Sequence, residues 1–124
     1  MTILTYTFDK GDSAGRDFHR EAIIWLVRHR GRCAYTYESG RAKFAAQFKS
    51  VMASMDIPLD ETVILQGSDR ARVKGGDGWT VVRMSRITRS LPWGGYIYQY
   101  DHKCEFHIKF DDEMLALQFK LALS

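Results

Sequence analysis

The chain has 124 residues, of which 45% are hydrophobic and 27% are charged. These values exclude a disordered chain and suit one domain, residues 1–124, that buries about two-thirds of its unfolded surface. Two cysteines exclude a disulfide framework, and no apolar run approaches the ~20 residues that span a membrane. Because the N-terminus lacks a basic start and a long apolar run, we expect a soluble cytoplasmic protein with no membrane partner.

Hydrophobic periodicity divides the chain into alternating strands and helices. In chain order, the predicted elements are a strand over 2–8, a helix over 14–29, a strand over 32–38, a helix from about 39 to 57, strands over 62–65, 70–74, 79–84, 96–100 and 104–110, and a helix from 111. Gly31 suits the left-handed cap of the first helix. A hairpin turn is expected at 75–78, a loop at 91–95 and a second turn at 101–103.

Two stretches that lie 71 positions apart align without a gap. One runs from Cys33 to Lys49 and the other from Cys104 to Lys120, and each is an alternating strand followed by an amphipathic helix. Apolar spacing places Phe48 and Phe119 at matching positions on the two helices, so both rings are expected to be buried against the same sheet. Cys33 and Cys104 are interpreted as small, reduced, buried residues, although neighbouring strands could bring them close.

This order of elements predicts the α+β class. Hairpin-linked strands require antiparallel pairing, so we expect a single mixed or mainly antiparallel sheet. About three helices should pack on one face of that sheet, and the fold should contain two similar β-to-α units. Nothing in the composition suggests a linker or a second domain.

Charge is distributed unevenly, although the net charge is only +3. Residues 28–49 and 70–89 each hold six Arg or Lys side chains and a single acid. Acidic residues gather instead at 56–61 and 111–113. Basic faces of this kind favour acidic proteins or nucleic acids as partners, whereas the alternative interpretation is a solvated surface.

No motif in the chain indicates catalysis or a cofactor. His102, Cys104 and His107 could be interpreted as metal ligands, but in one strand His107 would point to the opposite face from the other two. The chain has no nucleophile elbow, and the glycines at 75–78 lack the Lys-Ser/Thr that a phosphate loop needs. We therefore expect a non-enzymatic protein with no metal site and no cofactor.

Aromatic and arginine side chains mark the predicted binding site. Glycines at 94 and 95 could hold a tryptophan away from the sheet, and the next strand places three tyrosines on one side. The candidate partner-binding residues are Trp93, Tyr96, Tyr98, Tyr100, Arg83, Arg86 and Arg89. Such side chains are typical of protein–protein hot spots, which makes a protein the leading partner. The same tyrosines could instead be core, in which case they bind nothing.

Two alternatives to protein binding follow from the same residues. Rings for bases beside arginines for phosphates are what single-stranded nucleic acid requires, so a nucleic-acid-binding protein is the second hypothesis. High aromatic content could also serve self-association in a virion or assembly component. The sequence leaves the oligomeric state open.

The C-terminal segment carries the only family resemblance. Residues 110–121, Phe-Asp-Asp-Glu-Met-Leu-Ala-Leu-Gln-Phe-Lys-Leu, are similar to the closing strand and helix of small bacteriophage proteins. This resemblance implies a phage or mobile-element origin. It further implies a small inhibitor-type protein that engages a host macromolecule in the host cytoplasm. The resemblance assigns no functional residue.

Overall fold

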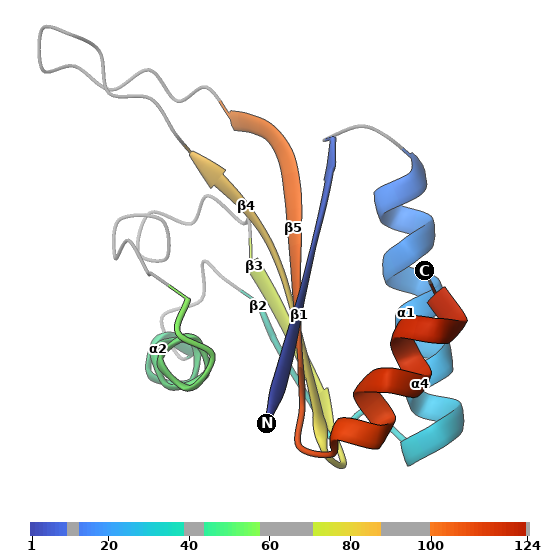
Figure 1. Ribbon diagram of the computed structural model, residues 1–124. Helices are drawn as coiled ribbons and strands as arrows, with labels where there is room; N and C mark the ends of the chain where they lie inside the picture. The colour runs from blue at the N-terminus through green and yellow to red at the C-terminus, as the bar shows by residue number, and fades with distance from the viewer. Residues whose placement is uncertain (10–12, 39–43, 58–70, 88–99, 124) are drawn as a thin grey trace, which may run out of the picture.

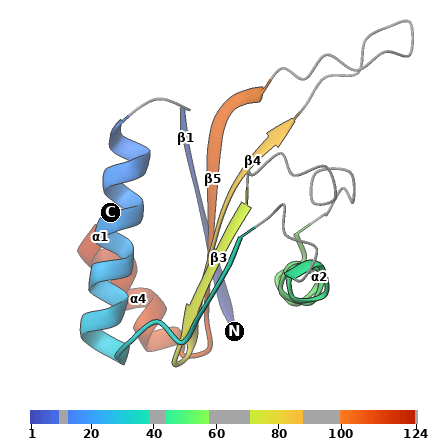
Figure 2. The ribbon, with the colours of Figure 1, turned by 180° about the vertical axis from the view of Figure 1, so that it is seen from behind.

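The protein is a single antiparallel sheet with helices on both of its faces (Figures 1 and 2). The computed structural model describes residues 1–9, 13–38, 44–57, 71–87 and 100–123. Within these ranges, the structure describes residues 9, 45, 71, 85–87 and 100–104 by their backbones alone. None of the described helices is long and apolar enough to cross a membrane.

Five strands and three helices make up the described part of the chain. Their bounds are β1 Thr2–Asp9, α1 Ser13–Arg30, β2 Tyr35–Glu38, α2 Ala45–Ser54, β3 Ala71–Gly76, β4 Trp79–Ile87, β5 Tyr100–Phe110 and α4 Glu113–Leu123. The strands lie in the order β1-β5-β4-β3-β2, and every neighbouring pair is antiparallel. The N-terminal strand β1 is therefore at one edge of the sheet, next to the last strand of the chain.

The helices begin and end where local chemistry requires. At the end of α1, Gly31 adopts a φ of 87°, and its N–H donates to the Val27 carbonyl at 2.8 Å. This is the left-handed cap that the sequence predicts, and a side chain there would be strained. At the start of α4, the Asp112 carboxylate accepts a hydrogen bond from the Met114 N–H at 2.8 Å. That bond satisfies one of the free donors at the helix start and lowers the pKa of Asp112.

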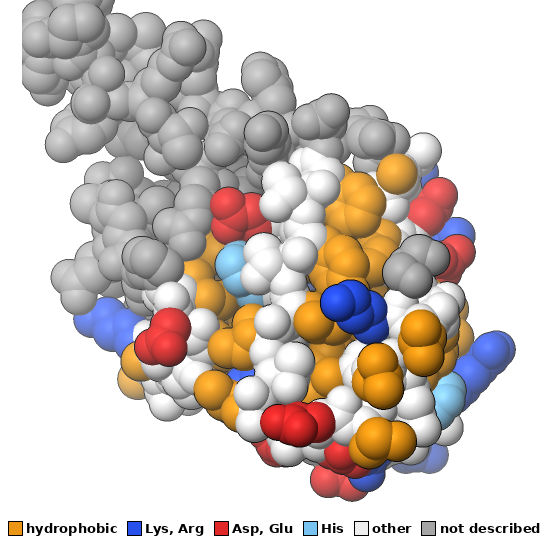
Figure 3. All heavy atoms as spheres, in the orientation of Figure 1, with side chains coloured by type: hydrophobic (Ala, Val, Ile, Leu, Met, Phe, Trp, Pro, Cys, Tyr) orange, Lys and Arg blue, Asp and Glu red, His pale blue; other side chains and the backbone are white. Residues whose placement is uncertain are grey.

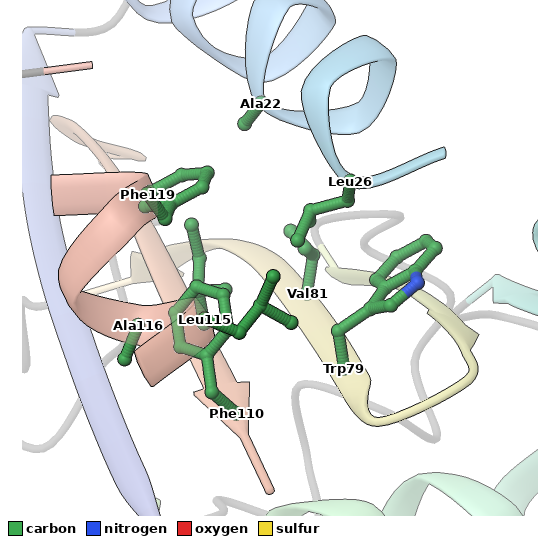
Figure 4. Close-up of a cluster of buried hydrophobic side chains, with 9 residues drawn as sticks. Ala22, Leu26, Trp79, Val81, Phe110, Leu115, Ala116 and Phe119 are labelled. Atoms are coloured by element: carbon green, nitrogen blue, oxygen red, sulfur yellow. The ribbon is translucent and has the colours of Figure 1, made fainter. Parts of the chain in front are cut away.

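A first core lies between the sheet and the pair α1 and α4 (Figure 4). Its buried members are Ala22, Leu26, Trp79, Val81, Ile108, Phe110, Leu115, Ala116 and Phe119. Phe119 is fully buried, and its ring lies 5.3 Å from that of Phe110 and 5.4 Å from that of Trp25. Rings from both helices and from β5 therefore meet around this side chain.

A second core lies on the opposite face, under α2. Its buried members are Phe48, Met52, Met55, Ile57, Val73, Val82 and Met84. Tyr35 and Tyr37 of β2 pack against it, with their rings stacked 5.0 Å apart. Phe48, like Phe119, is fully buried against the sheet, as the sequence predicts.

The predicted α+β class and the single antiparallel sheet are confirmed, and three helices lie within the described residues, as expected. The expectation that all helices pack on one face is wrong, because α2 covers the face opposite α1 and α4 (Figure 1). The reason is visible in β4, where Trp79 and Val81 enter the first core while Val82 and Met84 enter the second. A central strand that is apolar on both sides needs cover on both faces.

The turns follow the sequence in one case and depart from it in another. β3 and β4 form the expected hairpin, and Gly78 in its turn has a φ of 75°. The turn expected at 101–103 does not exist, because β5 is continuous from Tyr100 to Phe110 and pairs with β1 as far as Lys103. The predicted strand over 62–65 and the loop at 91–95 lie outside the described residues.

The two cysteines lie on different parts of the sheet. Cys33 comes just before β2, whereas Cys104 belongs to β5, and β4 and β3 separate these strands. At about 4.8 Å per strand, their backbones are about 14 Å apart in that direction alone, beyond the reach of a disulfide. Cys33 is a free, partly buried thiol that donates to the Tyr35 carbonyl at 3.1 Å.

Candidate binding surfaces

The candidate residues from the sequence fall mostly outside the described part of the chain. Arg83 is described, in the middle of β4. Arg86 of β4 and Tyr100 of β5 are placed by their backbones alone. Trp93, Tyr96, Tyr98 and Arg89 lie outside the described residues. Their role as partner contacts therefore stays a prediction, and Arg83 is the starting point for the described site.

The helices cover the sheet unevenly. α1 and α4 pack over β1, β5 and the start of β4, whereas α2 packs over β4, β3 and β2 on the other face. On the face that α1 and α4 share, β3 and β2 carry polar residues instead of apolar ones, at positions 72, 74, 36 and 38. The side chains at these positions lie outside the first core and are not part of it.

Three basic side chains lie together on this part of the sheet. Arg72 and Lys74 share one side of β3, and Arg83 is the cross-strand partner of Arg72 on β4. Val81, which belongs to the first core, pairs with Lys74 and fixes the side of the sheet to which they point. Lys74 and Arg83 are both partly buried. We call Arg72, Lys74 and Arg83 the basic surface.

The basic surface concentrates charge at a cost to the fold. Arg72 and Arg83 are directly opposite each other, an arrangement of like charges that destabilises a sheet. Glu38 of β2 offsets part of this cost through an ion pair with Arg72 at 3.2 Å. Among the described residues, neither Lys74 nor Arg83 has an acidic partner. A surface that keeps unpaired cations close together is suited to an anionic ligand.

The pKa of His19, in α1, is sensitive to the positive charges of the basic surface. Its ring stacks on Phe106 at 5.5 Å. Burial lowers the pKa of His19 to about 4, and the charges of Lys74, Arg83 and Arg72 contribute to that shift. The imidazole is therefore neutral at pH 7, and the basic surface consists of arginine and lysine alone.

The low pKa of His19 predicts a specific loss of stability in acid. Between about pH 6.5 and pH 4 the unfolded chain binds a proton that the folded chain does not, so stability is full above this range and falls as the pH drops through it. After allowance for solvent screening of the partly exposed ring, the loss should be about 1–2 kcal/mol. Urea unfolding at pH 7 and pH 4.5 should show this extra loss in the native chain and not in His19→Gln. Equal losses in the two proteins would contradict the assignment.

The exposed flank of α1 adds to the positive charge. Phe18 points toward β1 and α4, since its ring contacts those of Tyr6, Phe8 and Phe119. Helical periodicity puts Arg16 and Arg20 on the opposite flank, the one next to β3. Both arginines are exposed. Arg20 forms an ion pair with Asp17 at 3.4 Å, so on this flank it is Arg16 that adds net positive charge.

A second surface is apolar and belongs to α4. Met114, Leu117 and Leu121 recur at i, i+3 and i+7 and are 61%, 51% and 75% exposed. They form a stripe on the side of α4 opposite its buried residues Leu115 and Phe119. Figure 3 shows hydrophobic side chains gathered over α4, on the side of the molecule from which β1 is seen. We call Met114, Leu117 and Leu121 the α4 stripe.

A series of hydrogen-bonded side chains connects β1 and β5 on the face of the sheet that α2 covers. His107 Nε2 lies 3.1 Å from a carboxylate oxygen of Glu105, and His107 Nδ1 lies 3.4 Å from the Thr5 hydroxyl. The order of groups is that of a nucleophile, a base and an orienting acid. The contact to Thr5 is longer than the roughly 2.6–3.2 Å at which a base takes up a proton, so these residues are a cross-strand polar contact. Within the described ranges, no three His, Cys, Asp or Glu side chains gather as metal ligands do.

Comparison with known proteins adds no relative. No protein family, curated protein or solved structure matches the chain.

Sequence reasoning identified part of these surfaces. The charge count pointed to residues 70–89, which contain all of the basic surface, but only the strand register shows that Arg72 and Arg83 are opposite each other. The α4 stripe was missed because the stripe formed by Leu115, Phe119 and Leu123 already explains the helix. A second apolar repeat, at 114, 117 and 121, was the available signal.

Proposed function

We propose that this chain is a non-enzymatic binding protein that engages an acidic surface of a partner protein through its basic surface. The observation that carries the proposal is the concentration of Arg72, Lys74 and Arg83 on a part of the sheet that forms no core. Arginine is favoured in protein interfaces, and charge complementarity speeds association and rejects wrong partners. The mechanism is occupation of the partner's surface.

The phage origin implied by the C-terminal resemblance belongs to this proposal. A phage protein of this size whose sequence carries no catalytic motif would act on a host protein as an inhibitor, within the host cytoplasm. Trp93 and the tyrosines at 96, 98 and 100 would add aromatic contacts to the charged ones.

Single-stranded nucleic acid is the second candidate partner. The cross-strand pair Arg72 and Arg83 favours it, because two closely spaced cations suit successive phosphates. Glu38, which is paired with Arg72 on the same part of the sheet, argues against it because a phosphate backbone offers this carboxylate only repulsion, whereas a protein surface also carries N–H donors from which a carboxylate accepts hydrogen bonds. The balance of these two observations keeps a protein as the first candidate.

Charge reversal tests the proposal. The variant Arg72→Glu/Lys74→Glu/Arg83→Glu is compared with a control that reverses the same number of charges, Arg28→Glu/Arg32→Glu/Lys120→Glu, at exposed residues outside the basic surface. Two probes are titrated by fluorescence anisotropy: a peptide of ten glutamates and an oligothymidylate of twelve nucleotides. We expect the native chain and the control to bind the peptide, and the triple variant to lose at least about 2 kcal/mol of binding free energy.

The results of these titrations distinguish a protein partner from a nucleic-acid partner. Tighter binding of the oligonucleotide, with a log–log salt slope of about −0.7 per phosphate contacted, would replace the proposal with the nucleic-acid alternative. Equal binding by the triple variant and the control would mean that the basic surface is only solvated, which contradicts both.

A further inference from the structure

The edge formed by β1 has little of the usual protection against pairing. β1 has eight residues and pairs with β5 along its whole length without a register shift. No described residue pairs with its outer edge. Natural edge strands are kept apart by lysines, prolines, bulges or short length, but β1 contains no proline and its one charged residue is Asp9, at its last position. At the opposite edge, β2 has only four residues and ends in Glu38.

The side chains of β1 are suited to contact with an additional strand at this edge. Leu4 and Tyr6 pack against the first core but stay partly exposed, and Ile3 does the same against the second core. Thr5 and Thr7 are exposed, with compact β-branched side chains that favour extended pairing. A strand added at this edge would therefore cover apolar surface on both faces of the sheet.

The α4 stripe lies on the same side of the molecule as this edge. α4 contacts β1 and β5, and in Figures 1 and 3 the view that places β1 in front also shows hydrophobic side chains over α4. The α4 stripe thus lies on the same side of the molecule as the edge of β1. Monomeric proteins seldom leave such surface bare without a use.

We propose that two copies of this chain form a symmetric dimer in which β1 pairs with β1 of the second copy. Antiparallel pairing of identical strands requires a two-fold axis perpendicular to the sheet, which joins the two sheets into one of ten strands. With Thr5 nearest the axis, Leu4 of each copy is opposite Tyr6 of the other, and the alternation of faces continues across the junction.

The same axis brings the two α4 stripes toward each other. A perpendicular two-fold axis keeps both copies of α4 on one face of the joined sheet. Because α4 packs on β1 and β5, its axis lies within about one strand spacing of β1. The two copies of α4 are then about 5–15 Å apart, a range that includes the usual helix packing distance of 8–10 Å. Each feature is thus complementary to itself, as a two-fold interface requires. This inference does not depend on the proposed function.

Light scattering after size exclusion tests the dimer. The full chain of 14.3 kDa should elute with about twice that mass at a concentration of 100 µM or so. Thr5→Lys at the strand edge and Leu117→Lys on the α4 stripe should each raise the dissociation constant by about 100-fold or more. In each variant the two-fold axis would place the new lysine near the same lysine of the second copy, so the dimer would bury two like charges without a partner. Ile24→Lys is the matched control, since Ile24 is an exposed apolar residue of α1 outside this surface.

All the changed side chains are exposed, so the variants should keep the fold, and circular dichroism checks this. If Leu117→Lys unfolds, Leu121→Ser replaces it as a milder change of the α4 stripe, and if Thr5→Lys unfolds, Thr7→Lys replaces it on the strand edge. A monomeric native chain, or a dimer that tolerates both lysines, would overturn the proposal. So would a loss of dimer in Ile24→Lys as large as that in Leu117→Lys.

Discussion

Replacement of Phe119 by alanine should destabilise the protein by about 3–5 kcal/mol, since the ring is fully buried and the cavity it leaves cannot close. Phe119 contacts rings from β1, α1 and β5, so its loss loosens the three elements that α4 joins. Urea unfolding measures the change. Gln118→Ala is the matched control on the same helix and should shift stability by no more than about 0.5 kcal/mol, because Gln118 is exposed and belongs neither to the core nor to the α4 stripe. A Phe119→Ala protein that unfolds like the native chain would contradict the packing of α4.

Phe48→Ala should have an effect of similar size for a different reason. Phe48 is fully buried on the opposite face of the sheet, in the core that α2 makes with β3 and β4. Its loss should cost about 3–5 kcal/mol of unfolding free energy and should act through the second core alone. The control is Lys49→Ala, an exposed neighbour on the same helix.

The two phenylalanines also test the two-sided sheet. Since Phe48 and Phe119 lie on opposite faces and share no neighbour in their cores, loss of one should leave the aromatic chemical shifts of the other core almost unchanged. Large chemical-shift changes at Trp25 and Phe110 in Phe48→Ala would mean that Phe48 and Phe119 share one core. That result would support the prediction that all helices pack on one face of the sheet.

Local pattern determined much of the fold in advance. The strand β1, the helix α1 with its Gly31 cap, the β3–β4 hairpin and the burial of Phe48 and Phe119 all follow from periodicity and turn chemistry. These features depend on neighbours in sequence, which a pattern records. The expected turn at 101–103 failed because long-range pairing with β1 and β4 extends β5 through residues that favour a turn on their own.

The side of the sheet that each helix covers could not be read from the chain. α2 and α4 have similar apolar spacing, and nothing in that spacing distinguishes one face from the other. Val82 and Met84 were the relevant signal, because they make β4 apolar on both sides. The basic surface depends on the same information: Arg72 and Arg83 meet only through the register of β3 and β4, which joins positions that the sequence separates by a turn.

The pKa of His19 tests the central claim that the basic surface binds an anionic partner. It can be measured by NMR titration of the imidazole in the free chain and in the chain saturated with the ten-glutamate peptide. We expect a pKa of about 4 in the free chain, because His19 is partly buried and lies in the field of Lys74, Arg83 and Arg72. We expect a higher pKa in the complex, because bound carboxylates offset those charges. A pKa near 6.5 in the free chain, or one that stays unchanged when the peptide binds, would contradict this claim.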